Sequence, residues 1–534
     1  MKFTALCFGY FCIFFHQIAL CRPLDSLQSI RSETFRILPE NWNPKLAGDD
    51  VMSKLVKVTD PAVKGAHDAE MVIVDDFAYI VAEVNEQQAG ENASWPFVYS
   101  AMSIVNLKTL QVEKIIPIAK SGQIFLNGIL PLGSCFVPRI LRKDNNNLRC
   151  FFASENPGIR QSQTWYMDFD LNKQQFTNLI FRAKIKTASG VEDMIPVNFY
   201  RDAVKQGFRK NPVDHGFYII DSFKEMDGVI YVAINNYVGR QNALSKLNDE
   251  KDTFEIIGHF NDPQEMQLCE SAVNRLPDGT WMAIIRQDAG NYVFSKSNDG
   301  KVWGYAGYSE LIPNGSPSKP TFNKFNNMYY LGWQEAPGRF IFNIDVSIDG
   351  VNWERKYRFE ARGRGSFQYP SFHEYKGSIW LCVTQGGTER IMFGKLEDCN
   401  SNFAISTSAS SQVCPGTSVT LSTSNCNGSV SWNVGAIGSS ISVSPSTTTT
   451  YTATCTENNC ITDKIITVPV SSNSLILTGT AIAGAYKSTQ TLISTQVIPL
   501  GTVVSYQTGE SITLQPSFQI QAGSLFQTEI KRCN

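Results

Sequence analysis

Short apolar runs alternate with turn signals along most of the chain, from about Thr34 to Glu397. Asp-Gly, Asn-Gly and similar pairs separate many of these runs, and such pairs are typical of tight turns between β-strands. The sustained i, i+3, i+4 spacing of an amphipathic helix is absent. The pattern therefore predicts an all-β fold, with strands near 70–74, 78–81, 98–104, 217–220, 229–234, 281–285, 328–333, 379–383 and 391–393.

One heptapeptide pattern occurs twice within this region. Residues 297–303 read Ser-Asn-Asp-Gly-Lys-Val-Trp, and residues 347–353 read Ser-Ile-Asp-Gly-Val-Asn-Trp. In such a turn the Asp carboxylate accepts backbone N–H bonds, the Gly adopts a positive φ and the Trp folds back as a plug. Two copies fifty residues apart indicate a repeated unit, and this period suits a propeller blade of four strands.

The repeated pattern resembles the Asp-box of the sialidase (neuraminidase) superfamily, in the shortened form without a second Gly. In that family the motif lies on blade hairpins away from the active site, so the resemblance implies a fold and not a chemistry. It implies a six-bladed β-propeller over residues 30–398. The sequence pattern itself would also permit five or seven blades.

Two smaller β-rich segments are expected after the propeller. Residues 402–470 are rich in Ser, Thr and Asn, and they contain a Cys, a nearby Trp and a later Cys preceded by a Tyr, which is the pattern of an immunoglobulin-like sandwich. This resemblance implies the pairs Cys426–Cys455 and Cys414–Cys460, although four Cys allow three connectivities. Residues 471–534 repeat short alternating runs separated by Gly, which indicates a small β-solenoid-like module or a second small sandwich.

The N-terminus predicts export. Residues 1–21 carry Lys2, then an apolar stretch and a segment ending in Cys21, as in a secretory signal peptide. Leu20 is too large for the residue that precedes the Cys of a lipoprotein signal. Ten of the 13 Cys lie beyond this segment, an even number that suits disulfides, although Cys269 and Cys382 are expected as buried free thiols.

Charge and composition limit the classes of partner that the protein is expected to bind. The formal net charge is −2, which gives no electrostatic case for nucleic acid or for an anionic membrane surface. No later run is long and apolar enough to span a bilayer. The absence of C-x-x-C pairs and the scatter of five His argue against a zinc site. We expect a monomer that is secreted or lies at the cell surface, without a cofactor, and that binds a glycan or polysaccharide.

The sialidase resemblance also implies site residues. Family members hold the substrate carboxylate with three Arg, because planar guanidinium groups grip a carboxylate well, and they use a Tyr nucleophile activated by a Glu. The segment 269–286 is similar to the family segment in which Glu270 partners the Tyr and Arg286 binds the carboxylate. Arg339, ahead of the second heptapeptide, and Tyr369 follow in the family order. Each also has an ordinary interpretation as a surface Glu, a surface or loop Arg or a core Tyr.

The first part of the chain departs from the family pattern. His67 stands where the first Arg is expected, and Asp68 is a candidate acid/base only because it is adjacent. Arg139 is a candidate at the start of a blade, and Trp165 belongs to a mixed polar and aromatic segment, read as a loop, that could stack on a sugar. Lys319 could replace a missing cation. The alternative for these residues is packing or hydrogen bonding between blades.

Three functions follow from these residues. The first is an exo-sialidase-like glycoside hydrolase that removes a terminal acidic sugar through a tyrosyl intermediate. The second is a polysaccharide lyase or atypical glycosidase on the same propeller, in which His67 moves a proton. The third is a glycan-binding protein without catalysis. Four residues in family order favour the first.

Overall fold

The computed structural model describes residues 37–90, 97–156, 161–187, 189–195, 198, 217–236, 241–261, 266, 268–288, 290–325, 327–361, 366–399, 402–409, 412–457 and 460–531. The regular secondary structure of the described residues is almost entirely β, which confirms the expected all-β class, while the number of blades stays a prediction. The signal segment 1–21 lies outside the described residues. An α-helix, α1 (Pro44–Lys54), was not expected, although Asn43 and Pro44 form a recognisable start signal. The Asn43 side chain accepts hydrogen bonds from the N–H groups of Lys45 and Leu46, both 3.1 Å long.

Six sheets make up the described part of residues 56–397. The first contains β2 (Gly65–Val74), β3 (Phe77–Asn85), β4 (Tyr99–Asn106) and β5 (Val112–Ala119). The second contains β8 (Cys135–Arg142), β9 (Asn147–Asn156), β10 (Gln161–Asp170), β11 (Gln175–Phe176) and β12 (Phe181–Arg182). The third contains β13 (Lys184–Thr187), β14 (Gly190–Asp193), β15 (Phe217–Tyr218), β16 (Lys224–Met226), β17 (Val229–Asn236), β18 (Gln241–Leu247) and β19 (Thr253–His259).

The remaining three sheets contain three or four strands each. The fourth contains β20 (Leu268–Arg275), β21 (Trp281–Gln287) and β22 (Val293–Ser297). The fifth contains β23 (Thr321–Phe325), β24 (Met328–Glu335), β25 (Ile341–Ser347) and β26 (Glu354–Glu360). The sixth contains β27 (Phe367–Tyr375), β28 (Ser378–Gln385) and β29 (Arg390–Glu397), with β1 (Val56–Lys57) at its edge. A small hairpin, β6 (Ile124–Phe125) and β7 (Gly128–Ile129), lies between the first and second sheets in sequence.

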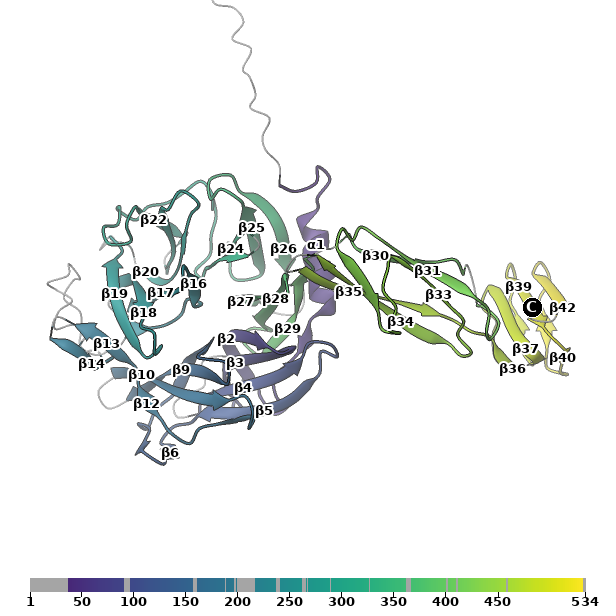
Figure 1. Ribbon diagram of the computed structural model, residues 1–534, viewed down its shortest axis with the longest axis horizontal. Helices are drawn as coiled ribbons and strands as arrows, with labels where there is room; N and C mark the ends of the chain where they lie inside the picture. The colour runs from purple at the N-terminus through teal and green to yellow at the C-terminus, as the bar shows by residue number, and fades with distance from the viewer. Residues whose placement is uncertain are drawn as a thin grey trace, which may run out of the picture.

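These six sheets are arranged as a ring around a common centre (Figure 1). Strand β2 contacts both β8 and β27, and β20 contacts both β17 and β23. Strand β1 precedes the first sheet in the chain but pairs with β29 of the last, with Val56 opposite Phe393. The two ends of the arrangement are therefore joined by backbone hydrogen bonds.

The first strands of four sheets share one irregularity. In each of β2, β8, β20 and β27, two residues stand opposite a single residue of the next strand, which is the arrangement of a β-bulge. The extra pairs are 68–69, 137–138, 269–270 and 369–370. Asp68, Val137 and Tyr369 have φ values of 49°, 52° and 49°, which non-glycine residues seldom adopt. A bulge redirects side chains, so these four strands turn selected residues out of the regular alternation.

The repeated heptapeptides form the expected tight turns after β22 and β25. The Asp349 carboxylate accepts hydrogen bonds from the N–H groups of Val351 and Asn352, both 2.8 Å long. Ser347 Oγ accepts the Gly350 N–H at 2.8 Å, and Gly350 has a φ of +74°. The copy at 297–303 repeats these bonds, and the buried Trp303 indole donates to the Gly300 carbonyl at 2.8 Å.

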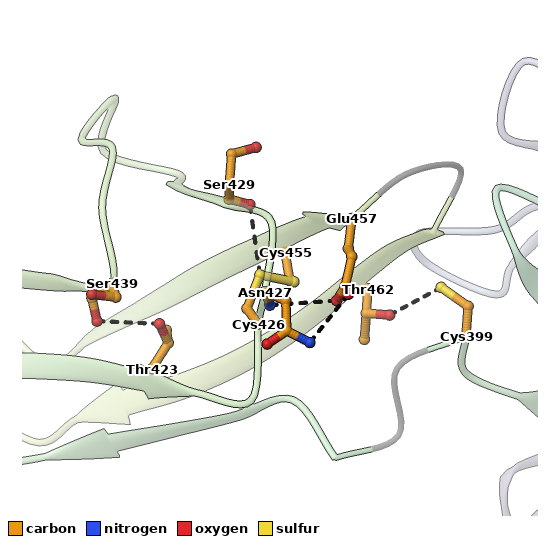
Figure 2. The surroundings of a disulfide bond; sticks show 9 residues. All are labelled: Cys399, Thr423, Cys426, Asn427, Ser429, Ser439, Cys455, Glu457 and Thr462. Carbon is orange, nitrogen blue, oxygen red and sulfur yellow. Dashed lines mark hydrogen bonds between the residues drawn. A yellow bond between two sulfur atoms is a disulfide. The ribbon is translucent and has the colours of Figure 1, made fainter.

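Two three-stranded sheets follow the ring. One contains β30 (Ala404–Thr407), β31 (Val419–Ser424) and β33 (Ser440–Val443), and the other contains β32 (Ser429–Trp432), β34 (Thr449–Glu457) and β35 (Cys460–Val468). Their shared core holds Trp432, Tyr451 and Cys455. Cys426 and Cys455 form the expected disulfide, which Figure 2 shows beside Asn427 and Glu457.

The other cysteines divide into bonded and free. Cys414 and Cys399 are disulfide-bonded. The predicted partner of Cys414 is Cys460, whose side chain lies outside the described residues, so this pairing stays a prediction. Cys269 and Cys382 are buried free thiols as expected, and Cys135 and Cys150 are also free and buried.

The last segment pairs its strands in parallel. It contains β36 (Ser472–Leu477), β37 (Gly484–Ser494), β38 (Val497–Ile498), β39 (Val503–Thr508), β40 (Ser511–Leu514), β41 (Gln519–Ile520) and β42 (Leu525–Ile530). Ser474 pairs with Thr491, and Thr491 pairs with Ser511. Parallel stacking of successive stretches of chain favours the solenoid-like interpretation over a second antiparallel sandwich.

We predict that Asp349→Ala lowers the stability of the ring at neutral pH by about 1 kcal/mol, because two N–H groups lose their acceptor. Slight burial raises the pKa of Asp349, but these N–H groups outweigh it and lower that pKa to about 2, below its ordinary 3.8. The stabilisation is therefore present above pH 3.8 and disappears as the pH falls through about 2. Thermal unfolding at several pH values measures the difference. Asp349→Asn keeps one acceptor oxygen and should lose less; equal losses for the two variants would contradict this role.

We predict that removing the Cys426–Cys455 disulfide destabilises residues 402–470 by about 3 to 4 kcal/mol, because the bond closes a loop with a sequence separation of 29. The double variant Cys426→Ala/Cys455→Ala should show a separate, earlier thermal transition. The transition of the ring should not move, because the disulfide lies outside it. A common shift of both transitions would show that the segments unfold together.

Candidate functional site

A hydrogen-bonded cluster joins the fourth and sixth sheets at the centre of the ring. The Tyr369 hydroxyl donates to Glu270 Oε1 at 2.5 Å. Arg286 Nη1 donates to the Tyr369 oxygen at 2.9 Å and to both Glu270 oxygens, at 2.8 and 2.7 Å. Three of the four residues that the sequence placed in order are therefore in direct contact.

Two bulges create this contact. Glu270 belongs to the bulge of β20 and stands opposite Arg286 of β21. Tyr369 belongs to the bulge of β27, with Gln368 and Ser371 as its paired flanking residues. Cross-strand neighbours lie within side-chain reach, so β20 and β21 deliver the carboxylate and the guanidinium together, and β27 brings the phenol to them.

Arg339 lies beside the same tyrosine. Its guanidinium carbon is 5.8 Å from the centre of the Tyr369 ring. Arg339 Nε donates to the Pro317 carbonyl at 2.8 Å, and Nη1 donates to Gln368 Oε1 at 2.5 Å. Arg339 and Arg286 are both partly exposed, which leaves guanidinium surface for an anion.

A second cluster lies next to Tyr369. The His67 and Tyr369 ring centres are 4.2 Å apart. The carboxylate of Asp68 accepts from Arg139 Nη2 at 2.9 Å through each oxygen and from Lys319 Nζ at 2.9 Å. Asp68, Arg139 and Lys319 are all buried, with exposed fractions of 2%, 0% and 2%. This ion cluster connects the first and second sheets and the segment that precedes β23.

Burial and neighbouring charges set the protonation of these groups. Burial alone raises the pKa of Glu270, but the Arg286 guanidinium and the Tyr369 hydroxyl bring it below its ordinary value. Burial and the Glu270 carboxylate raise the pKa of Tyr369 well above 10, against the opposing effect of Arg286 and Arg339. At neutral pH the site therefore contains an ionised Glu270 carboxylate that accepts a hydrogen bond from the neutral Tyr369 phenol.

The second cluster corrects three expectations. Burial raises the pKa of Asp68, but Arg139 and Lys319 together hold it below its ordinary value, so Asp68 is ionised and has no proton to donate. This geometry argues against an acid/base role for Asp68. Arg139 and Lys319 were expected to bind substrate, but both are buried and bound to Asp68. Sequence spacing did not reveal this pairing, because the three residues come from distant parts of the chain.

Trp165 was also expected in a sugar-stacking loop, and this expectation is wrong. It lies within β10, paired with Phe152 and Arg182 of the neighbouring strands. It is 8% exposed and packs in the same core cluster as Met167 and Phe169. The apolar and polar residues of its segment alternate as in a strand, but the polar residues before Trp165 led to the prediction of a loop.

Sequence reasoning missed two supporting residues. Asp288 Oδ1 lies 3.0 Å from Arg286 Nε and so holds the far side of that guanidinium. Gln368 orients Arg339. Their positions, two residues after Arg286 and directly before Tyr369, were the available signals.

A cavity of about 720 Å³ opens at the other end of the six inner strands. Residues from β2, β8, β16, β20, β23 and β27 line it, among them Glu70, Asn274 and His373. These residues lie further along the same strands than His67, Glu270 and Tyr369. The cavity is therefore separate from the tyrosine cluster.

The described residues contain no group of three or more His, Cys, Asp or Glu side chains arranged to hold a metal ion. They also contain no helix with the length and apolar character needed to cross a membrane.

Comparison with known proteins finds similarity in structure and no match in sequence. No protein-family model matches it, and no curated protein matches it. A protein of unknown function from Dyadobacter fermentans is 11% identical, with a TM-score of 0.46, over 64% of this chain and 97% of that one.

Two solved sialidase structures are similar at the same level. The Trypanosoma rangeli sialidase, solved with sialic acid, is 12% identical with a TM-score of 0.43, over 67% of this chain and 58% of that one. The intramolecular trans-sialidase from Ruminococcus gnavus is 11% identical with a TM-score of 0.43, over 65% and 97% of the two chains. All three TM-scores are below 0.5, so these similarities assign no activity to this chain.

We predict that Arg286→Met destabilises the protein by about 3 kcal/mol at pH 7, because it leaves the buried Glu270 carboxylate without its cation. Glu270 then acquires a raised pKa, whereas the native pKa lies below the ordinary 4.5. The ionised Glu270 stabilises the native protein above pH 4.5, and in the same pH range the unpaired carboxylate destabilises the variant. The difference in the free energy of unfolding between the two proteins should therefore shrink as the pH falls below 4.5. Chemical denaturation at pH 7 and pH 4 measures it. Arg286→Met/Glu270→Gln should recover part of the loss; no recovery would mean that Glu270 is not the group left unpaired.

Proposed function

We propose that residues 56–397 form a six-bladed β-propeller and that the protein is an exo-sialidase-like retaining glycoside hydrolase. The observation that carries this proposal is the direct contact of Tyr369 with Glu270 and Arg286. A phenol has an ordinary pKa of about 10 and is a weak nucleophile unless a base takes its proton. Glu270 is placed to do so, at 2.5 Å from the phenol oxygen.

The first chemical step forms a tyrosyl glycoside. The Tyr369 oxygen attacks the anomeric carbon while its proton moves to Glu270, and the bond from that carbon to the leaving oxygen breaks. Water then attacks the same carbon and the bond to Tyr369 breaks. Glu270 returns its proton to the Tyr369 oxygen, and the proton released by the water passes to solvent. Arg286 stabilises the charge that develops on the phenol oxygen, and Arg339 with the Nη2 group of Arg286 would hold a substrate carboxylate.

The state of Asp68 shapes the substrate range. A sugar leaving group needs a proton as the glycosidic bond breaks, whereas a phenol leaving group departs as an anion. Because the ion-paired Asp68 is a poor donor, we infer that aryl sialosides are cleaved much faster than sialyl disaccharides.

We also propose that the protein is exported. The proposal is supported by the signal-like residues 1–21 and by the disulfides of residues 399–455. The two segments after the ring would be an immunoglobulin-like sandwich and a solenoid-like module, and their two-sheet and parallel pairings support this.

A second candidate activity rests on His67. Its ring packs against Tyr369 at 4.2 Å, so an imidazole and a phenol stand together beside two guanidinium groups. In a lyase these groups would remove a proton next to a uronate carboxylate, and the elimination would leave an unsaturated sugar.

We predict that the mature protein releases the fluorophore from an aryl sialoside, and that Tyr369→Phe and Glu270→Gln each lower the rate at least 100-fold, because each removes the activated nucleophile. Fluorescence reports this hydrolysis, and near-ultraviolet absorbance on uronate polysaccharides reports elimination in a parallel assay. Trp165→Phe is the control that should leave the rate unchanged, because Trp165 lies in the core away from Tyr369.

The outcomes separate the candidates. Absorbance that requires His67 would replace the hydrolase with the lyase. A silent result in both assays, with glycan binding unaffected by Tyr369→Phe, would leave a binding protein.

A further inference from the structure

The segment 316–320 carries a buried lysine next to the tyrosine ring. Lys319 Nζ lies 5.7 Å from the centre of the Tyr369 ring and 2.9 Å from Asp68 Oδ1. Its side chain is 2% exposed. The Pro317 carbonyl of the same segment accepts from Arg339 at 2.8 Å. This segment therefore anchors one cation and supplies another, both beside Tyr369.

The lysine charge exceeds what the local acid needs. Arg139 Nη2 already lies 2.9 Å from both oxygens of Asp68, and Arg139 is fully buried. Within this cluster two cations therefore face one carboxylate. Burying an ammonium group costs several kcal/mol unless it is compensated. A fold that needed only to hold Asp68 would not require Lys319.

Other charges also face Tyr369. Glu270 and Cys269 approach it from β20, Arg286 from β21, Arg339 from the segment before β25, and His67 from β2. Arg286 is bound to two carboxylates, those of Glu270 and Asp288, and the buried Glu70 carboxylate accepts from Ser371, two residues after Tyr369. Among these groups Lys319 is a buried cation held beside the phenol ring, so its charge favours a phenolate over a neutral phenol.

We propose that Lys319 is a positioning residue that places a buried positive charge beside the Tyr369 ring and thereby favours the phenolate form of Tyr369. Asp68 and Arg139 hold the ammonium group in that place. The use of this phenolate as a nucleophile rests on the proposed hydrolase function, but the electrostatic effect does not.

The test measures the ionisation of residue 369 without a substrate. A trifluorotyrosine at position 369 gives ¹⁹F signals from that site alone, and its electron-withdrawing fluorines bring the phenol pKa into a range that the folded protein tolerates. We expect Lys319→Met to raise the pKa of this residue by about one pH unit or more. Lys319→Arg keeps the charge and should leave the pKa nearly unchanged.

A second variant reverses the sign. Asp68→Asn removes the negative charge and leaves two cations, so it should lower the pKa of residue 369. Loss of packing alone would not move Lys319→Met and Asp68→Asn in opposite directions. Lys356→Met is the matched control, because Lys356 is also buried, bound to Glu397 and 5.4 Å from the ring of another tyrosine, Tyr330. It should leave residue 369 unaffected.

The results decide between the proposals. An unchanged pKa in Lys319→Met, or shifts of the same sign in Lys319→Met and Asp68→Asn, would overturn the role of Lys319. If Lys319→Met unfolds, as judged by circular dichroism, the Asp68→Asn shift carries the test and an unchanged or raised pKa overturns the proposal. The expected shifts in a protein that hydrolyses no sialoside would overturn the proposed function and leave the role of Lys319 standing.

Discussion

Four carboxylates are buried at the centre of the ring, and their need for partners holds the sheets together. Asp68, Glu70, Asp221 and Glu270 are each 2% or 3% exposed. A buried carboxylate without a partner is very unfavourable, and each of these groups has at least one hydrogen-bond partner in another sheet. Glu70 of the first sheet accepts from Ser222 at 2.7 Å and from Ser371 of the sixth. Asp221 binds Lys224 and accepts the Val273 N–H of the fourth sheet.

This constraint places the candidate site on rigid strands. The residues that meet at Tyr369 come largely from bulges in the first strands of the sheets and not from long loops. The bulged residues sit in backbone conformations that the surrounding sheet must enforce, as the φ of 49° at both Asp68 and Tyr369 indicates. Because each bulge is fixed by paired residues on both sides, the side chains that it redirects are held in position before any ligand arrives.

The sequence predicted some of this because the signals were local. Alternation fixed the strands, and the turns at 299–300 and 349–350 followed from short-range chemistry. The contact between Glu270 and Arg286 could be foreseen because both lie in one hairpin. The cluster of Asp68, Arg139 and Lys319 could not, because it joins residues that are far apart in the chain and no local pattern records their pairing. The prediction for Trp165 was wrong for another reason, because polar residues on a strand resemble those of a loop. The helix 44–54 was overlooked although Asn43 and Pro44 marked its start.

The charges around Tyr369 fall into two groups that differ in access to solvent. Arg286 and Arg339 are partly exposed and can meet an anionic ligand, whereas Arg139 and Lys319 are buried and cannot. A buried charge acts in a medium of lower effective dielectric constant and is screened less by salt. The buried group would therefore affect the phenol at all salt concentrations, while the exposed group would respond to ionic strength and to the ligand.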